Sequence, residues 1–231
     1  MSRMLTVHQI HRLAYDEAFA LQCRVVEDYH QNPRDAGTLI LLEHPPVITI
    51  GRSGTEQNIL ASPEELRRAG VSVHETNRGG DVTYHGPGQI VGYPILPLAH
   101  HGKDVHAYLR RLESIIMATL WEYGIKADRR EGYTGVWTPA GKIASIGVAI
   151  SHWIAYHGFA LNVAPNLDHF SLIHPCGLVG IRVTSMEKLM ETGPARAEVE
   201  ERLIAHFCSE FKFESVRSSE DSGGHQTDSR K

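Results

Sequence analysis

Apolar and polar residues alternate along residues 4–10, a pattern that predicts an opening β-strand. Residues 15–29 then place apolar side chains at helical spacing and predict a helix. Two runs rich in leucine and β-branched residues, at residues 38–43 and 47–50, predict two strands. His44 and two prolines separate these runs, so we expect a stiff corner between the strands.

Four more helices are predicted by start signals and apolar stripes. The clearest covers residues 104–123, which carry one apolar stripe and end directly before a glycine. A shorter helix is expected over residues 62–70, because a serine, a proline and two acids open it. A capping-box pattern with Thr184 as its first residue predicts another short helix. Residues 194–211 form the last predicted helix.

The second half of the chain predicts a β-sheet. Residues 135–137, 142–151 and 153–163 predict successive strands of an antiparallel sheet. A helix of about 20 residues laid on such strands implies an α+β layer architecture, a mixed or antiparallel sheet with packed helices. We expect one domain over residues 1–213, and a disordered tail over the polar, serine-rich residues 214–231.

Composition narrows the class of protein. Of the 231 residues, 42% are hydrophobic and 22% are charged, and no apolar run approaches the roughly 18 residues of a membrane span. The first residues lack a continuous apolar segment, so no secretory signal is expected. Cys23, Cys176 and Cys208 form no paired framework and indicate a reducing compartment, so we expect a cytoplasmic protein. Cys23 and Cys208 border helical apolar stripes, where we expect them to be buried and inert.

Charge gives a weaker signal. A net charge of -4 argues against a general nucleic-acid binder. Basic pairs recur at residues 67–68, 110–111 and 129–130; such pairs usually lie on solvated surface, but gathered on one face they could receive an acidic partner protein. The 15 histidines show no ligand spacing with a supporting cysteine or acid, so no metal site is expected.

One segment concentrates unusual chemistry, residues 78–93 with the sequence RGGDVTYHGPGQIVGY. Turn chemistry predicts a hairpin in which residues 82–85 turn through Gly86-Pro87-Gly88 into residues 89–95. A hairpin alone does not explain an Arg-Gly-Gly start with His85 and Gln89 at the two strand ends. Because glycine allows close approach to the backbone, we expect this segment to form the wall of a ligand pocket.

Cys176 is the candidate nucleophile, since it lies in the loop sequence His-Pro-Cys-Gly with no helical stripe to bury it. A free thiol has a pKa of about 8.5, so a cationic or basic group must lie close to generate the thiolate. The candidates are His174, His85, His157 and Lys142. Lys142 begins an apolar strand, where it could be partly desolvated and share a proton with the thiol, or could keep its ammonium in water at the sheet edge.

Three segments together resemble the octanoyltransferases of lipoate biosynthesis, a family similar in fold to lipoate and biotin protein ligases. They are residues 78–89 (RGGDVTYHGPGQ), 141–163 (GKIASIGVAISHWIAYHGFALNV) and 175–186 (PCGLVGIRVTSM). The segments occur in the family's order, and the resemblance covers most of the chain from about residue 39 to residue 190. The first motif is highly specific.

The resemblance implies that Cys176 takes an octanoyl group as a thioester and that Lys142 is its acid/base partner. The donor would be octanoyl-acyl carrier protein, and the acceptors a lysine on lipoyl domains of 2-oxoacid dehydrogenase complexes and the glycine cleavage H protein. This reaction is the first step of endogenous protein lipoylation and needs no cofactor. The implied substrate-binding residues are Arg78, Gly79, Gly80, Asp81, Val82, Thr83, Tyr84, His85, Ser145, Ile146, Gly147, Gly158, Phe159 and Ala160.

General chemistry adds expectations to these roles. A tetrahedral oxyanion needs donors, for which the backbone N–H groups beside Gly147 and Gly177 are candidates. The octanoyl chain needs an apolar slot, which Tyr84, Ile146 and Phe159 could line. In the second half-reaction, Lys142 or His85 could accept the proton of the acceptor amine, although His85 is better placed to shape the pocket.

Three other functions remain open from the sequence. An ATP-dependent lipoate or biotin ligase would use the same fold without a nucleophilic cysteine. A cysteine hydrolase would pair Cys176 with His174 or His85 and use water as the acceptor. A module that only binds a carrier protein would use the basic pairs as its contact surface.

Overall fold

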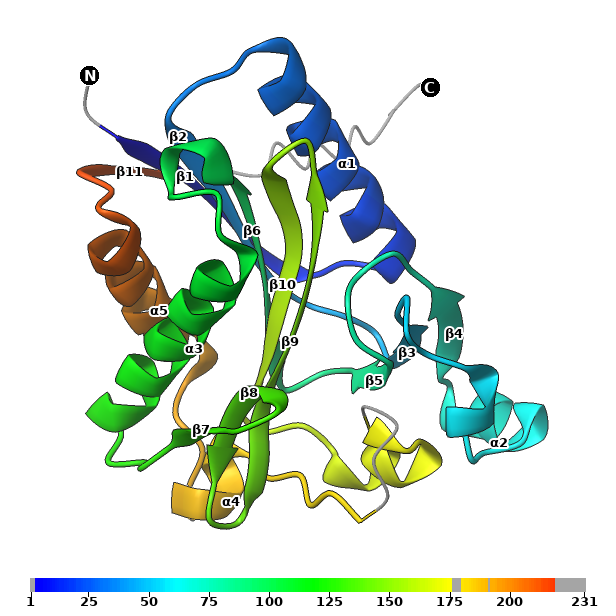
Figure 1. The fold of residues 1–231 in the computed structure, drawn as a ribbon. Helices are drawn as coiled ribbons and strands as arrows, with labels where there is room; N and C mark the ends of the chain where they lie inside the picture. The colour runs from blue at the N-terminus through cyan, green and yellow to red at the C-terminus, as the bar shows by residue number, and fades with distance from the viewer. Residues whose placement is uncertain (1–2, 176–179, 191, 219–231) are drawn as a thin grey trace, which may run out of the picture.

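A computed structural model describes residues 3–175, 180–190 and 192–218 of the chain. These residues form a large β-sheet, a small β-sheet and helices on both sides of the large sheet (Figure 1). The large sheet has the strand order β11-β1-β2-β6-β10-β9-β8-β7, and the small sheet has the order β4-β3-β5. The predicted α+β class with a mixed sheet is therefore confirmed.

The large sheet contains β1 (Met4–Arg12), β2 (Ala36–Glu43), β6 (Gln89–Pro97), β7 (Asp128–Arg130), β8 (Tyr133–Thr138), β9 (Gly141–Ser151), β10 (Ile154–Asn162) and β11 (Ser215–Ser218). The small sheet contains β3 (Val47–Ile50), β4 (Ser72–Glu75) and β5 (Val82–His85). The α-helices are α1 (Tyr15–Gln31), α2 (Pro63–Ala69), α3 (Val105–Glu122), α4 (Met186–Met190) and α5 (Arg196–Phe211). Short 3-10 turns occur at η1 (Glu56–Asn58), η2 (Leu98–His100) and η3 (Leu167–Leu172).

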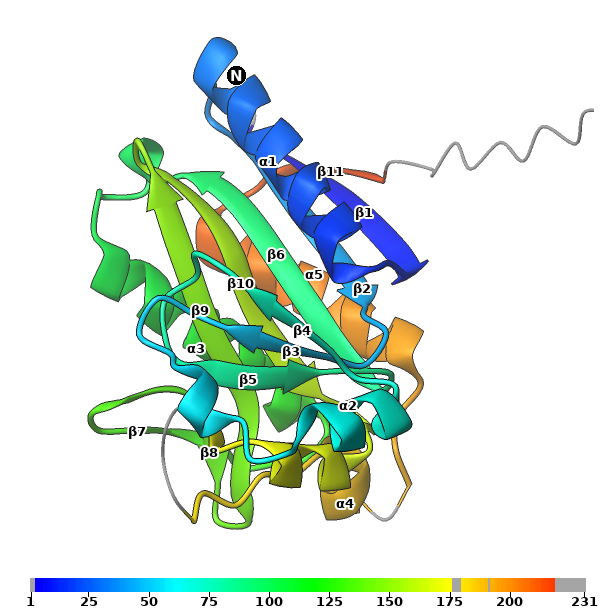
Figure 2. The ribbon, with the colours of Figure 1, turned by 90° about the vertical axis from the view of Figure 1, so that its right-hand side faces the viewer.

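The predicted hairpin around Gly86-Pro87-Gly88 is wrong. Both predicted strands exist, but β5 pairs with β3 of the small sheet, whereas β6 pairs with β2 and β10 of the large sheet. Gly88 is fixed at the crossing, because its carbonyl accepts the N–H groups of Val163 at 3.1 Å and Ala164 at 2.9 Å. The glycine-rich turn therefore carries the chain from one sheet to the other, and Figure 2 shows the small sheet crossing in front of the large one.

The predicted tail also needs correction. Residues 215–218 form β11, which runs parallel to β1 at the edge of the large sheet. All four residues of this strand are exposed, and they form no apolar face that could pack on a core. The strand is therefore held by backbone pairing with β1, which the pattern of residues does not reveal. The remaining residues of the predicted tail, 219–231, lie outside the described part of the chain.

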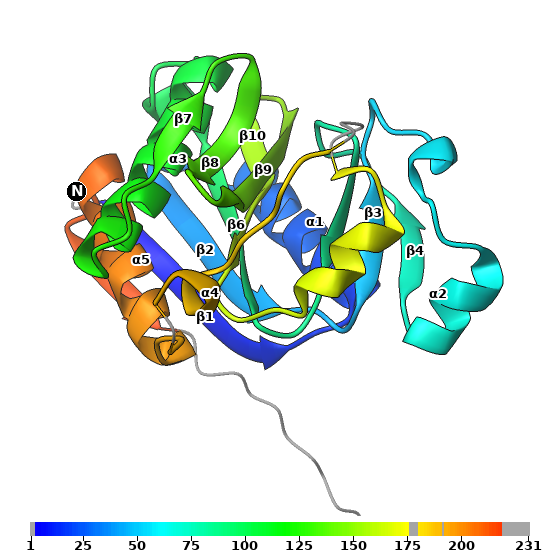
Figure 3. The same cartoon turned by 90° about the horizontal axis from the view of Figure 1, so that it is seen from below.

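Two hydrophobic layers hold the helices on the large sheet. The apolar stripes of α3 and α5 pack on one face, where Leu112, Ile116, Leu203 and Phe207 are at most 1% exposed. α1 packs on the opposite face, with Ala18 and other apolar side chains against β2, β6 and β10. Figures 1 and 3 show this three-layer arrangement, with the small sheet beside α1. A third cluster joins the small sheet to α2 and η3.

Local capping explains where two helices begin. The Ser62 side chain accepts the backbone N–H of Glu65 at the start of α2, and the Glu65 carboxylate accepts the N–H of Ser62 in return. The Asp104 carboxylate accepts the N–H of Ala107 at the start of α3. At α4, by contrast, the cap is the Ser185 hydroxyl, and not Thr184 as the sequence pattern predicted.

Two further expectations concern exposure. Cys208 is half-buried beside the core, but Cys23 is exposed on α1, so its predicted burial is wrong. The α1 stripe instead turns Gln22 and Val26 inward, which leaves Cys23 on the flank of the helix. Among the described helices, none combines the length and the apolar content that a membrane span requires.

Candidate active site

A cavity of about 570 Å³ lies between the glycine-rich loop and strands β9 and β10. It is lined by residues from two of the three segments that carry the family resemblance, the glycine-rich segment and residues 141–163. Lining residues predicted from the sequence are Arg78, Gly79, Gly80, Asp81, Val82, Thr83, His85, Lys142, Ser145, Ile146, Gly147, Gly158, Phe159 and Ala160. The fold thus brings residues 78–85 to the same cavity as the start of β9 and the middle of β10.

Tyr84 is the exception among the predicted lining residues. Its side chain is 1% exposed and packs in the small-sheet cluster, edge-on to Phe170. Its hydroxyl lies 2.6 Å from Nδ1 of His169, away from the cavity. Alternation along β5 explains this, since neighbouring side chains on a strand point to opposite faces. The expectation that Tyr84 lines the acyl slot is therefore wrong.

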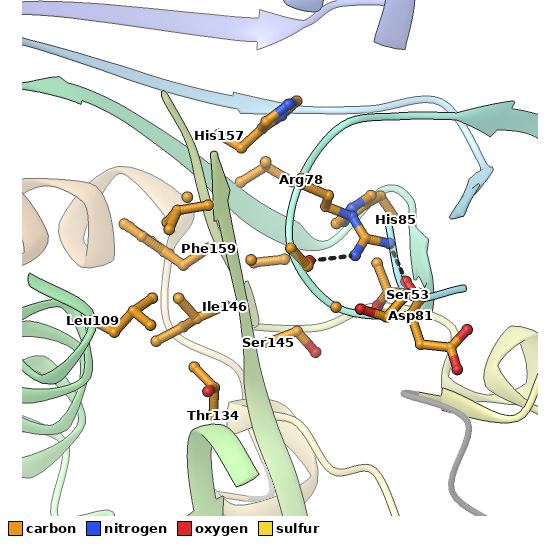
Figure 4. A pocket seen from close by; sticks show the side chains of 18 of the residues that line it. Ser53, Arg78, Asp81, His85, Leu109, Thr134, Ser145, Ile146, His157 and Phe159 are labelled. Atoms are coloured by element: carbon orange, nitrogen blue, oxygen red, sulfur yellow. Dashed lines mark hydrogen bonds between the residues drawn. The ribbon is translucent and has the colours of Figure 1, made fainter. Parts of the chain in front are cut away.

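Arg78 holds the glycine-rich loop in place. Its guanidinium is buried and donates to the backbone oxygens of Thr49 at 2.7 Å, Gly79 at 3.0 Å and Asp81 at 2.7 Å. These carbonyls take up the positive charge by hydrogen bonding, as a buried cation requires. The bonds from Arg78 to the Gly79 and Asp81 oxygens are drawn as dashed lines in Figure 4. Arg78 thus fixes the backbone of the cavity wall from inside the protein.

A glycine at position 147 permits the loop to reach β9. The backbone N–H of Gly79 donates to the Val148 carbonyl at 2.8 Å. A Cβ atom at position 147 would lie only 2.6 Å from the Gly79 carbonyl oxygen, closer than van der Waals contact allows. Any larger residue at position 147 would push the loop away from the strand and widen the cavity.

Lys142 lies at the start of β9 and is only 4% exposed. Of the two alternatives that the sequence left open, an ammonium held in water at the sheet edge is therefore wrong. The register between β8 and β9 shifts by one residue next to Lys142, and such bulges redirect side chains. A Cβ atom on Gly135 would lie 2.7 Å from Cε of Lys142, so the lysine side chain lies close against the β8 backbone.

Cys176 and Gly177 lie outside the described residues, but the chain on both sides of them is anchored at the cavity. Before Cys176, the N–H of His174 donates to the Asn58 carbonyl at 2.8 Å, and the Asn58 amide donates to the Asp81 carboxylate at 2.7 Å. After it, the Lys142 N–H donates to the Arg182 carbonyl at 2.8 Å, and the Thr184 N–H donates to the Lys142 carbonyl at 2.9 Å. The segment before Cys176 is therefore linked to the glycine-rich loop through Asn58, and the segment after it is bonded to Lys142 directly.

Three buried histidines near the cavity are neutral. Burial lowers the pKa of His44 to about 4 and the pKa of His157 to about 3. Burial, with smaller contributions from His44 and Arg78, holds the pKa of His85 well below its usual range. Nδ1 of His85 lies 3.2 Å from the Gln89 side-chain oxygen, which can only accept. Nδ1 therefore carries the proton, and Nε2 is left as an acceptor.

The cavity has a polar and an apolar part. Figure 4 shows Arg78 with Ser53, Asp81 and His85 on one side, and Leu109, Ile146 and Phe159 together on the other. Ile146 and Phe159 are opposite each other in the β9–β10 register, and Leu109 comes from α3. The apolar part matches in character the slot that an aliphatic chain requires.

Several lining residues were not named individually from the sequence. Leu109 and Val105 lie on the α3 stripe, which indicates only core packing, whereas Val91 and Tyr93 lie within the predicted wall segment, residues 78–93. Val148 lies within residues 141–163, as does His157, which the sequence suggested only as a partner for Cys176. The remaining lining residues lie outside the three segments that carry the resemblance: Tyr15, Ser53, Gly132, Tyr133 and Thr134. In residues 3–175, 180–190 and 192–218, no cluster of three or more histidine, cysteine or acidic side chains could hold a metal ion.

Comparison with known proteins agrees with this geometry. Residues 14–208 match the lipoyl protein ligase A/B catalytic domain. The octanoyltransferase of Syntrophotalea carbinolica is 47% identical over 200 residues, which make up 87% of this chain and 91% of that protein. The octanoyltransferase of Myxococcus xanthus is 45% identical over 218 residues, which make up 92% of this chain but only 61% of that longer protein.

A crystal structure of lipoate-protein ligase A bound with ATP has the same fold, with a TM-score of 0.74 at 16% identity, covering 96% of this chain and 89% of that chain. The chain therefore belongs to the lipoyl protein ligase A/B catalytic domain family. Both of the curated relatives named above are octanoyltransferases, which are acyltransferases, so the resemblance indicated by the sequence motifs is confirmed.

Proposed function

We propose that this protein transfers an octanoyl group from octanoyl-acyl carrier protein to a lysine of a lipoyl domain through a thioester on Cys176. The observation that carries the proposal is the position of Lys142, buried at the cavity and bonded through its backbone to the segment that follows Cys176. Relatives named octanoyltransferase support the nature of the acyl group. The apolar cavity side chains Leu109, Ile146 and Phe159 support an aliphatic substrate.

In the first half-reaction, Lys142 takes the proton from the Cys176 thiol, and the thiolate attacks the carbonyl carbon of the donor thioester. The tetrahedral intermediate expels the carrier thiolate, which receives the proton from Lys142. The donor thioester is already activated, so no ATP enters the reaction. The expected oxyanion donors are the backbone N–H groups beside Gly147 and Gly177.

In the second half-reaction, the amine of the acceptor lysine attacks the acyl-enzyme thioester and loses a proton. Lys142 suits this proton transfer better than His85, because burial makes His85 a weak base. His85 keeps Nε2 as a hydrogen-bond acceptor at the cavity and so orients substrate. Collapse of the intermediate forms the amide and releases Cys176, which regains the proton.

The test is transfer from octanoyl-acyl carrier protein to a lipoyl domain in the absence of ATP. We expect the wild-type protein to transfer the group and Cys176→Ala to lose about a thousandfold or more of this activity. Cys23→Ala is the matched control, because Cys23 is an exposed thiol that does not line the cavity, and it should retain full activity.

Two results would contradict the proposal. Full transfer activity in Cys176→Ala would show that the reaction does not pass through a thioester on Cys176. An absolute requirement for ATP would instead indicate a ligase of the kind whose fold this chain shares.

A further inference from the structure

A second cavity, of about 740 Å³, adjoins the first beside the start of β9. It is lined by β7, β8, Gly141 and residues 180–182, and Tyr133 lines both cavities. We call this second cavity the cationic groove. Its lining includes the basic residues Lys126, Arg129, Arg130 and Arg182 against one acidic residue, Asp128. A cationic groove of this kind contrasts with the net charge of -4 on the whole chain.

Three of the four cations are available to a ligand. The Arg129 guanidinium is committed to α3, where it contacts the Glu113 carboxylate at 2.9 Å and the Ser114 hydroxyl at 2.7 Å. Lys126, Arg130 and Arg182 are exposed, and none of them forms an ion pair with a carboxylate of the described chain. Of the basic pairs at residues 67–68, 110–111 and 129–130, only Arg129 and Arg130 line this groove. Of these two, only Arg130 has no carboxylate partner among the described residues.

Trp137 joins the groove to Lys142. Its ring centroid lies 5.1 Å from the guanidinium carbon of Arg130 and 5.3 Å from Nζ of Lys142. Arg130 also lies 4.9 Å from the ring centroid of Tyr133, so two aromatic rings fix its position. The indole Nε1 of Trp137 is buried and has no hydrogen-bond acceptor among the described residues.

We propose that the cationic groove binds the phosphodiester of a phosphopantetheine-type arm on the acyl donor. This inference rests on the proposed function, because it places the donor's thioester at Lys142 and its anionic group in the adjoining groove. Guanidinium groups suit phosphate oxygens in charge and geometry, and Arg130 and Arg182 supply two of them. An acyl carrier protein and coenzyme A both carry such an arm, so the arm is the common feature that the groove recognises.

The test compares donors that share the octanoyl-pantetheine arm and differ in the group attached to the end of that arm. Octanoyl-pantetheine lacks phosphate, whereas octanoyl-phosphopantetheine, octanoyl-coenzyme A and octanoyl-acyl carrier protein carry it. We expect Arg130→Gln and Arg182→Gln each to lower kcat/KM about tenfold for the three phosphorylated donors. Both variants should leave kcat/KM for octanoyl-pantetheine unchanged. Added salt should weaken the wild-type preference for phosphorylated donors.

Arg68→Gln is the matched control, since Arg68 is an exposed cation on α2 outside both cavities, and it should change no donor's kcat/KM. Equal effects of the groove variants on phosphorylated and phosphate-free donors would overturn the inference. So would a loss confined to octanoyl-acyl carrier protein, which would indicate contact with the carrier's acidic surface. If the wild-type protein used none of the four donors, the proposed function itself would fail.

Discussion

At the scale of single residues, burial decides the protonation of the histidines around the site. His44 is fully buried, donates from Nδ1 to the Leu13 carbonyl and accepts the Tyr93 hydroxyl at Nε2, each at 2.7 Å. His157 is 1% exposed, and its Nε2 donates to the Asn77 side-chain oxygen at 2.7 Å. Each ring donates a hydrogen bond in the neutral form, and protonation would put an unpaired charge into the interior.

This arrangement predicts an acid-sensitive fold. The folded-state pKa values of His44 and His157, about 4 and about 3, lie below the ordinary value of 6.5. Between the folded-state and the unfolded-state pKa, the unfolded chain binds more protons than the folded chain. The contribution of the neutral histidines to the free energy of unfolding is therefore fully present above about pH 6.5 and is lost as the pH falls below that value. Each histidine should contribute a slope of about 1.4 kcal/mol per pH unit in that window.

Denaturant unfolding of wild type and His44→Gln between about pH 6 and pH 5 checks this prediction. Glutamine can keep both hydrogen bonds of His44 but cannot titrate. On acidification, the free energy of unfolding of the variant should therefore fall less steeply than that of wild type, by about 1.4 kcal/mol per pH unit. Identical slopes would mean that protonation of His44 does not oppose folding.

At the scale of elements, a buried carboxylate joins α3 to β7 and β8. Glu113 is fully buried and accepts from Arg110 at 2.7 Å, Arg129 at 2.9 Å and the Gly135 N–H at 3.1 Å. Gly135 is also the residue over which the Lys142 side chain lies. The helix thus fixes the strand backbone that supports Lys142.

Glu113→Ala should lower the free energy of unfolding by about 2 to 3 kcal/mol, because it leaves the Gly135 N–H without an acceptor and breaks two ion pairs. The half-exposed arginines limit the loss, since they can regain water. Glu64→Ala, which removes an exposed ion pair to Arg67, is the control and should cost less than about 1 kcal/mol. Similar losses in the two variants, measured by denaturant unfolding, would contradict a special role for Glu113.

The elements themselves were largely predictable, but their partners were not. Helical stripes and caps located α1, α2, α3 and α5, because these signals are local in sequence. The pairing of β5 with β3 depends on backbone groups more than thirty residues away, so turn chemistry at Gly86-Pro87-Gly88 gave the wrong hairpin. The strand β11 likewise exists only because β1 offers an open edge.

At the scale of the whole molecule, the fold brings together chemistry that the sequence separates. The motifs identified the glycine-rich loop and Lys142, and the structure places both at one cavity. The sequence could not identify Leu109 or Ser53 as lining residues, because a helical stripe residue and a loop serine carry no site signal of their own. It also could not assign Tyr84 to the small-sheet cluster, since strand orientation depends on the tertiary fold.

The proposed function depends above all on a covalent acyl intermediate on Cys176 that Lys142 helps to form. Intact-mass measurement after mixing with octanoyl-acyl carrier protein, without ATP or acceptor, tests it most directly. Wild type should gain the mass of one octanoyl group and keep it, Lys142→Ala should acquire the group about a hundredfold or more slowly, and Cys176→Ala should remain unmodified. A modified Cys176→Ala protein, or rapid release of free octanoic acid by wild type with no lasting adduct, would contradict the claim.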